Sequence, residues 1–382
     1  MRLYADHNAT SPLRPEAREA MLRALERGGN PSSVHAEGRR AKAMLEDARE
    51  ELAVVLEVRA EAVTFTSGAT EALHLAMHSA RAMGFGPVFV SAAEHDAVWA
   101  QAGRLWPDFE TISVGPDVTP DLEALEARLS GVVGKPLVIA QAANNETGAV
   151  SPVGRLSHLA RRAGGALLCD GVQAFGKLPV SAVAGYADWL VVSSHKIGGP
   201  QGAGALVTAP GVEVRSDRSG GGQERGARPG TENLPAISGF AAAAGVACSD
   251  DAVALFQALT GAERNAFEAV LRAEAPDDIV ILSEQAPRLS NTTCVALPGR
   301  EAARQVMALD LAGAAVSAGS ACSSGKVKAS RVLGAAGWPP HVAGCAIRAS
   351  FGWSSRPGDG ARLAERYLKV AAQLAHRTVE KV

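Results

Sequence analysis

The chain has 382 residues, of which 47% are hydrophobic and 20% are charged, and its formal net charge is −2. This length favours two or three domains with a large core, and the composition is typical of a soluble globular protein. The small net charge, without any block of five or more like charges, argues against direct binding to nucleic acid or to an anionic membrane surface.

The N-terminal sequence and the cysteines favour a cytoplasmic, reduced protein. Residues 1–6 lack the apolar stretch of a signal peptide, and the most apolar helix candidate, residues 236–247, is too short to span a bilayer. The odd number of cysteines and the lack of a C-x-x-C motif argue against a disulfide framework and a structural zinc site. The cysteines are Cys169, Cys248, Cys294, Cys322 and Cys345.

Helix and strand patterns alternate along the first two-thirds of the chain. Apolar side chains recur at helical spacing over residues 36–56, and further helix patterns lie near 70–83, 121–129 and 154–164. Short apolar runs typical of buried strands separate the helices, at residues 63–66, 88–90, 112–114, 137–139, 166–169, 189–192 and 205–207. The alternation predicts an α/β fold with a mostly parallel, doubly wound sheet.

The pattern changes after residue 210. A loop rich in glycine and arginine at residues 220–231 precedes a long helical stretch over 235–274. The remainder holds strand candidates at residues 279–282 and 291–297 and helix candidates at 300–310 and 359–377. It also holds a Ser/Gly loop at 317–325. We predict a large domain over residues 15–250, and a smaller α+β domain made of residues 1–14 and 251–382.

Polar residues follow five of the predicted strands at their downstream ends. In open α/β sheets, ligands bind outside the carboxyl ends of the strands, so five such clusters indicate one shared site. The clusters are residues 67–70, His95, residues 144–145, residues 170–173 and residues 193–196.

Lys196 stands between a strand end and the glycine-rich turn 198–204. Burial at such a place lowers the pKa of the amine and makes it a nucleophile, while the glycines let a bulky ligand approach the backbone. The alternative, common for a lysine in a Gly/Pro turn, is an ordinary solvated side chain.

Two other clusters suggest which ligand Lys196 would meet. Residues 67–70 lead from a strand into a helix, so free backbone N–H groups and the helix dipole offer a phosphate site, although such a sequence can equally be a helix cap. Asp170 directly follows an apolar strand and could bind a metal, a ribose or a protonated ring nitrogen. An amine, a carboxylate and a phosphate site together match pyridoxal phosphate.

Several segments resemble those of the cysteine desulfurases, which are fold-type I pyridoxal-phosphate enzymes of the class V aminotransferase group. The resemblance extends in order from residue 4 to about residue 352. The segments include DHNATSP at 6–12, GNPSS at 29–33, FTSGATE at 65–71, NNETG at 144–148, SSHKIGGPQGAG at 193–204, GGGQERGARPGT at 220–231 and GSAC at 319–322.

The resemblance implies a role for each candidate site residue. Lys196 would carry the cofactor as a Schiff base, His95 would stack on its ring and transfer protons, and Asp170 would pair with the ring nitrogen. Arg348, together with Asn145, would bind the substrate carboxylate, a task suited to a bidentate guanidinium. The ring hydroxyl would lie near Gln173 and Asn145, and the phosphate would contact Ala69, Thr70, Ser193 and His195, with Thr231 reaching the phosphate site of the other subunit of a homodimer.

Cys322 decides which chemistry follows. It lies in a Ser/Gly loop where an exposed, mobile thiol can enter the site and leave again. By resemblance, it would take sulfur from L-cysteine as a persulfide, release L-alanine and pass the sulfur to an acceptor protein, either an iron–sulfur scaffold or a relay for tRNA thiolation. The alternatives are a selenocysteine lyase or a related transaminase, in which Cys322 is incidental, and a scaffold without activity, which the intact Lys196 argues against.

No metal site is expected. His74 and His78 are four positions apart on a predicted helix, but the sequence offers them no evident third ligand. We therefore interpret them as part of one face of that helix. The four other cysteines lie in strand-like or helix-like runs and are interpreted as structural.

Overall fold

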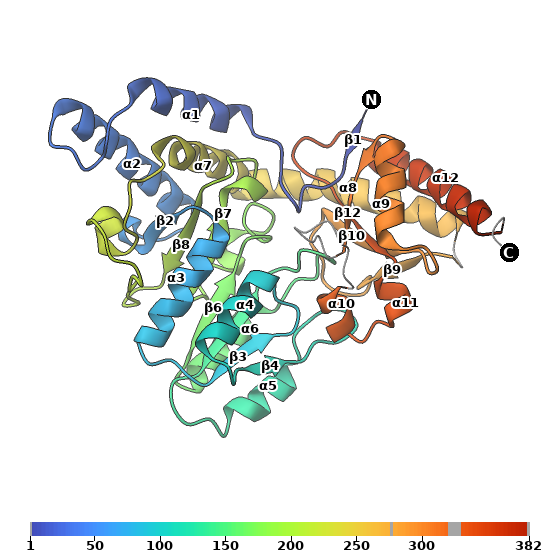
Figure 1. The fold of residues 1–382 in the computed structure, drawn as a ribbon, viewed down its shortest axis with the longest axis horizontal. Coiled ribbons are helices and arrows are strands. Elements are labelled where there is room, and N and C mark those ends of the chain that lie inside the picture. The colour runs from blue at the N-terminus through green and yellow to red at the C-terminus, as the bar shows by residue number, and fades with distance from the viewer. Residues whose placement is uncertain (1, 276–277, 320–329, 380–382) are drawn as a thin grey trace.

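The computed structural model describes residues 2–275, 278–319 and 330–379, so Cys322 lies outside the described residues. Figure 1 shows a larger part built around one twisted sheet and a smaller part beside it. The long helix α8 (Asp250–Glu274) runs from the first part into the second.

The larger part is organised around a seven-stranded sheet in the described residues, and only β8 runs against its neighbours. The predicted α/β fold with a mostly parallel sheet is therefore confirmed. Across the sheet the order is β2 (Val63–Thr66), β8 (Gly204–Thr208), β7 (Trp189–Ser193), β6 (Ala166–Asp170), β5 (Leu137–Gln141), β3 (Val88–Ser91) and β4 (Glu110–Ile112).

Helices cover both faces of this sheet because its central strands are apolar on both sides. Successive side chains of a strand point to opposite faces. In β5, Val138 and Ala140 join the core beneath α1 (Pro15–Arg27), α2 (Ala36–Val55), α5 (Leu122–Leu129), α6 (Val153–Arg162) and α7 (Leu234–Ala247). Leu137 and Ile139 instead join the core beneath α3 (Ala69–Ala82) and α4 (Asp96–Leu105).

The smaller part has its own sheet and core. Its four described strands pair antiparallel in the order β12 (Ser317–Ala318), β13 (Ala346–Ser350), β10 (Thr292–Ala296) and β9 (Val280–Leu282). Helices α8, α9 (Ala302–Leu311) and α12 (Asp359–Val379) pack on it around Phe267 and Tyr367. Two short helices, α10 (Arg331–Ala335) and α11 (Pro340–Ala343), complete this part.

The N-terminal segment, residues 3–14, joins the two parts. Its strand β1 (Leu3–Tyr4) pairs with β11 (Ala314–Ala315), and Asp6 bridges to Ser350. Farther along, the Ser11 backbone N–H donates to the His195 carbonyl at 2.9 Å. The segment thus reaches Lys196 from the side of the smaller part. The proposed domain boundaries at 14/15 and 250/251 stay predictions.

Two predicted elements differ from the structure. The strand expected at 112–114 is β4, and it ends at Ile112, where pairing with β3 stops; Val114 makes only an isolated bridge to Pro120. The helical stretch 235–274 is two helices, α7 and α8, which meet at 76°. The break occurs because the Ser249 hydroxyl accepts from the Ala252 N–H at 3.2 Å and starts a new helix there.

Among the described residues, no single helix has the length and apolar character needed to cross a membrane. The bent pair of α7 and α8 passes that test by length and composition only.

Candidate active site

A cavity of about 770 Å³ opens at the carboxyl ends of β2, β3, β5, β6 and β7. This volume is typical of a small-molecule or cofactor site. The predicted site residues that line it are Ala69, Thr70, His95, Asn145, Asp170, Gln173, Ser193, His195, Lys196 and Arg348.

One predicted site residue in the described part of the chain, Thr231, does not line this cavity. Thr231 is exposed and lines a second, smaller cavity that shares Ser67 and Gly202 with the first. Cys322 lies outside the described residues.

Lys196 lies at the end of a single 3₁₀ turn, Ser194–Lys196, directly after β7. Its Nζ atom donates to the carbonyl oxygens of Asn8 and Ala9, at 2.6 and 2.8 Å. Burial, and then the charge of Arg348, lower the pKa of the amine to about 8. A substantial fraction of the amine is therefore neutral near physiological pH.

Asp170 is the last residue of β6 and is buried at the base of the cavity. Burial raises the pKa of its carboxyl, although its Oδ1 accepts from the Val172 N–H at 3.0 Å, which favours the charged form. A cationic N–H group placed beside Asp170 would stabilise the carboxylate.

One end of the cavity is built to bind an anion. Helix α3 starts there, directly after its N-cap residue Gly68, and none of the described side chains caps its N-terminus. The Ser193 hydroxyl is buried beside it without a hydrogen-bond partner among the described residues. The Glu71 carboxylate accepts from the Ser67 N–H at 2.6 Å and fixes the turn. Free N–H groups, a free hydroxyl and the positive end of the helix dipole suit a phosphate.

His95 presents an exposed imidazole to the cavity from the N-terminus of α4. Its Nδ1 accepts from the Ala97 N–H at 3.1 Å, and this contact assigns the proton of the neutral ring to Nε2. A fixed tautomer lets the ring donate or accept a proton at one defined atom.

Arg348 extends from β13 of the smaller part into the same cavity, with its side chain 2% exposed. Its Nη2 donates to Asp6 at 2.8 Å and its Nη1 donates to the Asn145 carbonyl at 3.0 Å. The Nε atom is buried and has no partner among the described residues. The guanidinium is thus held in place by two of its five N–H donors, and the Nε–H group is among those left for a ligand carboxylate.

The side chains of Gln173 and His195 are held in place by hydrogen bonds to neighbouring protein groups. Gln173 donates to the Asn8 carbonyl at 3.0 Å and accepts from Lys177 Nζ at 2.6 Å. His195 contacts the Thr10 hydroxyl at 3.2 Å. Burial, and then the charge of Lys196, lower its pKa to about 4, so the ring is neutral at physiological pH.

Sequence reasoning missed four residues around the site: Asn8, Lys177, Glu94 and Glu146. Asn8 supplies a carbonyl to Lys196, and its side chain accepts from the buried amine of Lys177 at 2.9 Å. Glu94 is fully buried, and burial raises the pKa of its carboxyl well above the usual value. Glu146 accepts from the Ser330 hydroxyl at 2.6 Å, and burial raises its pKa to about 7. Asn8 and Glu146 belong to segments on which the family resemblance rests. That resemblance was the sequence signal that could have identified them as site residues.

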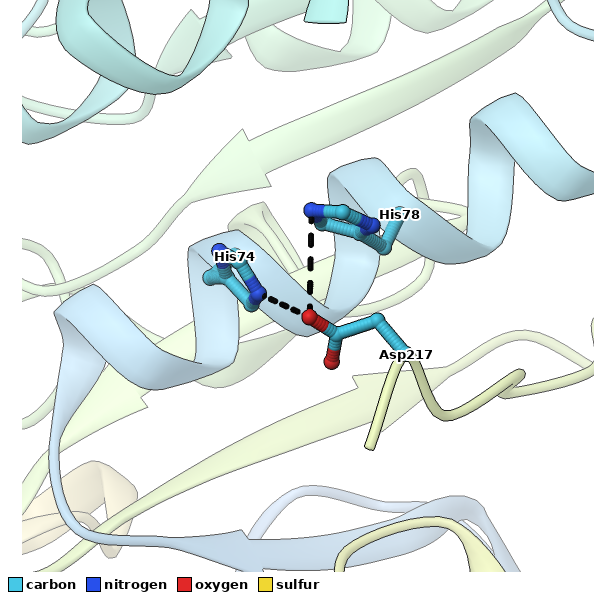
Figure 2. Close-up of side chains that lie close together, drawn as sticks. All are labelled: His74, His78 and Asp217. Atoms are coloured by element: carbon cyan, nitrogen blue, oxygen red, sulfur yellow. Dashed lines mark hydrogen bonds and ion pairs between the residues drawn. The ribbon is translucent and has the colours of Figure 1, made fainter. Parts of the chain in front are cut away.

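The structure adds a carboxylate to the pair of His74 and His78, for which the sequence offered no evident third ligand. The carboxylate of Asp217 lies beside both imidazoles (Figure 2). The sequence could not indicate this because Asp217 is 143 positions away from His74.

The residues present fit pyridoxal phosphate. A buried amine of lowered pKa can bond to its aldehyde, Asp170 can pair with its ring nitrogen, and the uncapped start of α3 with Ser193 can bind its phosphate. The unpaired Ser193 hydroxyl is the observation that argues most directly for an anionic group at that end.

Comparisons with known proteins agree with this chemistry. The chain is 40% identical to the cysteine desulfurase of Cereibacter sphaeroides, covering 98% of this chain and 96% of that protein. It is 37% identical to the cysteine desulfurase of Frankia sp. (strain EuIK1), covering 100% and 92%. The structure of a NifS-like protein from Rickettsia africae ESF-5 superposes with a TM-score of 0.87 at 30% identity, covering 98% and 100%.

These neighbours confirm the predicted fold-type I architecture. A family model described as aminotransferase class-V matches residues 3–359. The chain therefore belongs to the aminotransferase class-V family.

Proposed function

We propose that this protein is a cysteine desulfurase that uses pyridoxal phosphate to convert L-cysteine to L-alanine and holds the sulfur as a persulfide on Cys322. The observation that carries the proposal is the meeting of Lys196, Asp170, His95 and Arg348 in one cavity. An amine, a carboxylate, an imidazole and a guanidinium are the groups that bond the cofactor, tune its ring, move protons and bind an amino acid. The similarity to proteins named cysteine desulfurase supports the choice of substrate.

The side chains divide the chemistry among them. When bound, pyridoxal phosphate supplies an electron-withdrawing ring that stabilises negative charge at the substrate Cα. Arg348 orients the substrate carboxylate, so that the Cα–H bond faces Lys196. The Lys196 amine, once neutral, accepts the Cα proton at Nζ. The negative charge of Asp170 keeps the ring nitrogen protonated, and His95 returns or accepts protons at Nε2.

Sulfur transfer then requires a thiolate. The thiolate of Cys322 attacks the sulfur of the substrate, a new S–S bond forms and the Cβ–S bond breaks. The electron pair of the broken bond stays on the substrate and is protonated, which gives L-alanine. The net change is L-cysteine and a thiol to L-alanine and a persulfide, so no external oxidant or reductant is needed.

We propose three further properties of this protein: a homodimeric state, delivery of sulfur to an acceptor protein and a cytoplasmic location. The exposed Thr231, in a cavity adjoining the main one, supports a site shared with a partner subunit. Exposed apolar side chains on and next to α1 and α2 also support a partner surface there; they are Leu22, Leu25, Val34 and Val54. The family resemblance favours an iron–sulfur scaffold as the acceptor, with a tRNA-thiolation relay as the other candidate.

The test is a single-turnover assay with L-cysteine on the protein loaded with pyridoxal phosphate, following alanine and protein-bound sulfur together. The variant is Cys322→Ala, and Cys345→Ala, which removes a buried thiol, is the matched control. The proposal expects alanine and persulfide in the parent and in the control, and the loss of both in Cys322→Ala.

A different result would identify a different enzyme. Alanine from both the parent and Cys322→Ala, with the sulfur released as elemental sulfur, would indicate a lyase of the selenocysteine lyase kind in which Cys322 takes no part. 3-Mercaptopyruvate in place of alanine, with the amino group left on the cofactor, would indicate a transaminase.

A further inference from the structure

A second cluster of side chains of metal-ligating types lies beside α3 (Figure 2), and none of the three lines the two cavities described above. The Nε2 atom of His74 lies 2.6 Å from Oδ2 of Asp217, and the Nε2 atom of His78 lies 3.9 Å from the same oxygen. The two imidazole rings, one helical turn apart, have their centroids 4.2 Å apart. Three donor atoms thus point at one place, with all of them within 4.8 Å of one another.

Asp217 is held there by contacts that do not involve the histidines. On its N-terminal side, the Arg215 N–H donates to Ser79 Oγ at 2.9 Å, and the Arg215 guanidinium donates to the Ala82 carbonyl at 2.9 Å. On its C-terminal side, the Arg218 guanidinium bonds to Glu71. The segment 215–218 therefore lies antiparallel along one face of α3 and presents Asp217 between the two histidine turns.

We propose that His74, His78 and Asp217 form a binding site for a divalent transition metal, with zinc as the expected occupant. Two imidazoles and one carboxylate, with the histidines four residues apart on a helix, are a donor set that zinc takes readily. The remaining coordination position would be filled by water, because each of the three side chains is about one-quarter exposed.

The donor atoms need only small movements to meet a metal. With metal–ligand distances of about 2.0–2.1 Å in a tetrahedron, two donors lie roughly 3.3 Å apart. The observed 2.6 and 3.9 Å separations lie on either side of that value, so each changes by about 0.6–0.7 Å.

A metal here would connect two segments that also serve the cavity. Helix α3 begins at the anion-binding end, and the segment holding Asp217 precedes the loop that contains Thr231. Glu71 joins the two, since it accepts from both Arg218 and Arg228. The metal would therefore fix the loop that contains Thr231 relative to α3. This effect does not depend on which amino acid binds in the cavity.

The experiment measures zinc retained by the cofactor-loaded protein at equilibrium with nanomolar free zinc, buffered by a chelator. All variants carry Cys322→Ala, so that the expected exposed thiol does not compete for metal. His78→Gln is the test variant, because at 3.9 Å His78 makes the weaker contact and its loss keeps the 2.6 Å contact of His74. His158→Gln removes an exposed imidazole on α6 and is the matched control.

The proposal expects one zinc per chain in the parent and in His158→Gln, and a loss of affinity of about 100-fold or more in His78→Gln. Zinc should also slow tryptic cleavage after Arg215 and Arg218 in the parent and in His158→Gln, but not in His78→Gln. An unchanged melting temperature without metal shows that His78→Gln is folded. Equal zinc contents in the three proteins, or retention only at millimolar zinc, would overturn the proposal.

Discussion

The lowered pKa of Lys196 predicts the pH at which the site becomes reactive. The pKa of this amine is about 8. At pH 7.5, roughly one-quarter of the amine is then neutral, compared with roughly one molecule in a thousand for an ordinary lysine. Below this pKa the amine is protonated and cannot attack a carbonyl; above it the neutral form dominates, so reactivity rises through pH 8 and then levels.

Competitive labelling with acetic anhydride measures this directly, because the reagent is small and uncharged. The cofactor-free protein is labelled briefly across pH 6.5–10.5, and peptides containing Lys196 and the exposed Lys42 of α2 are quantified by mass spectrometry. We expect the Lys196 rate to reach its plateau about two pH units below that of an ordinary lysine.

A variant of Arg348 tests what lowers the pKa of Lys196. Arg348→Met removes a positive charge that lowers this pKa, so the Lys196 midpoint should move upward. A labelling rate for Lys196 that still rises above pH 9.5 in the parent would refute the reasoning. An unchanged midpoint in Arg348→Met would assign the whole effect to burial.

The remaining predictions concern a buried ion pair and the base of the cavity. Arg49 and Glu224 form a bidentate pair with side chains 3% and 0% exposed, so Glu224→Gln should lower the unfolding free energy by about 3–5 kcal/mol in urea titrations. Breaking the exposed pair of Arg162 with Glu126 should cost less than about 1 kcal/mol; equal losses would contradict the burial argument. Asp170→Asn should lower kcat on cysteine by about 100-fold or more while KM changes little, and steady-state kinetics with an unchanged kcat would exclude the role given to Asp170.

The sequence carried much of the fold and most of the cavity. Apolar runs between helical patterns identified the strands, and residues at the ends of parallel strands must lie along one edge of the sheet. His95, Asp170 and Lys196 could therefore be grouped without coordinates, and the structure brings them into one cavity.

The features that the sequence missed depend on long-range packing. The carbonyls of Asn8 and Ala9 bind Lys196 across more than 180 positions, and a backbone group leaves no residue pattern. In the sequence, Asp217 cannot be distinguished from any other loop carboxylate. Only the packing of its segment against α3 brings it to His74 and His78. Such contacts are set by how segments dock, which hydrophobic periodicity does not encode.

The path of residues 3–14 has a consequence for synthesis on the ribosome. The β1 strand, blue in Figure 1, needs Ala314 and Ala315 as its partners, and the Asn8 backbone N–H donates to the Ser350 hydroxyl oxygen at 2.9 Å. A nascent chain therefore leaves β1 unpaired until more than 300 further residues have emerged. The larger sheet can assemble first, whereas we expect the carbonyls that hold Lys196 to settle beside it once the strands of the smaller part have been made. We therefore expect the environment of Lys196 to be completed only after the smaller part has folded.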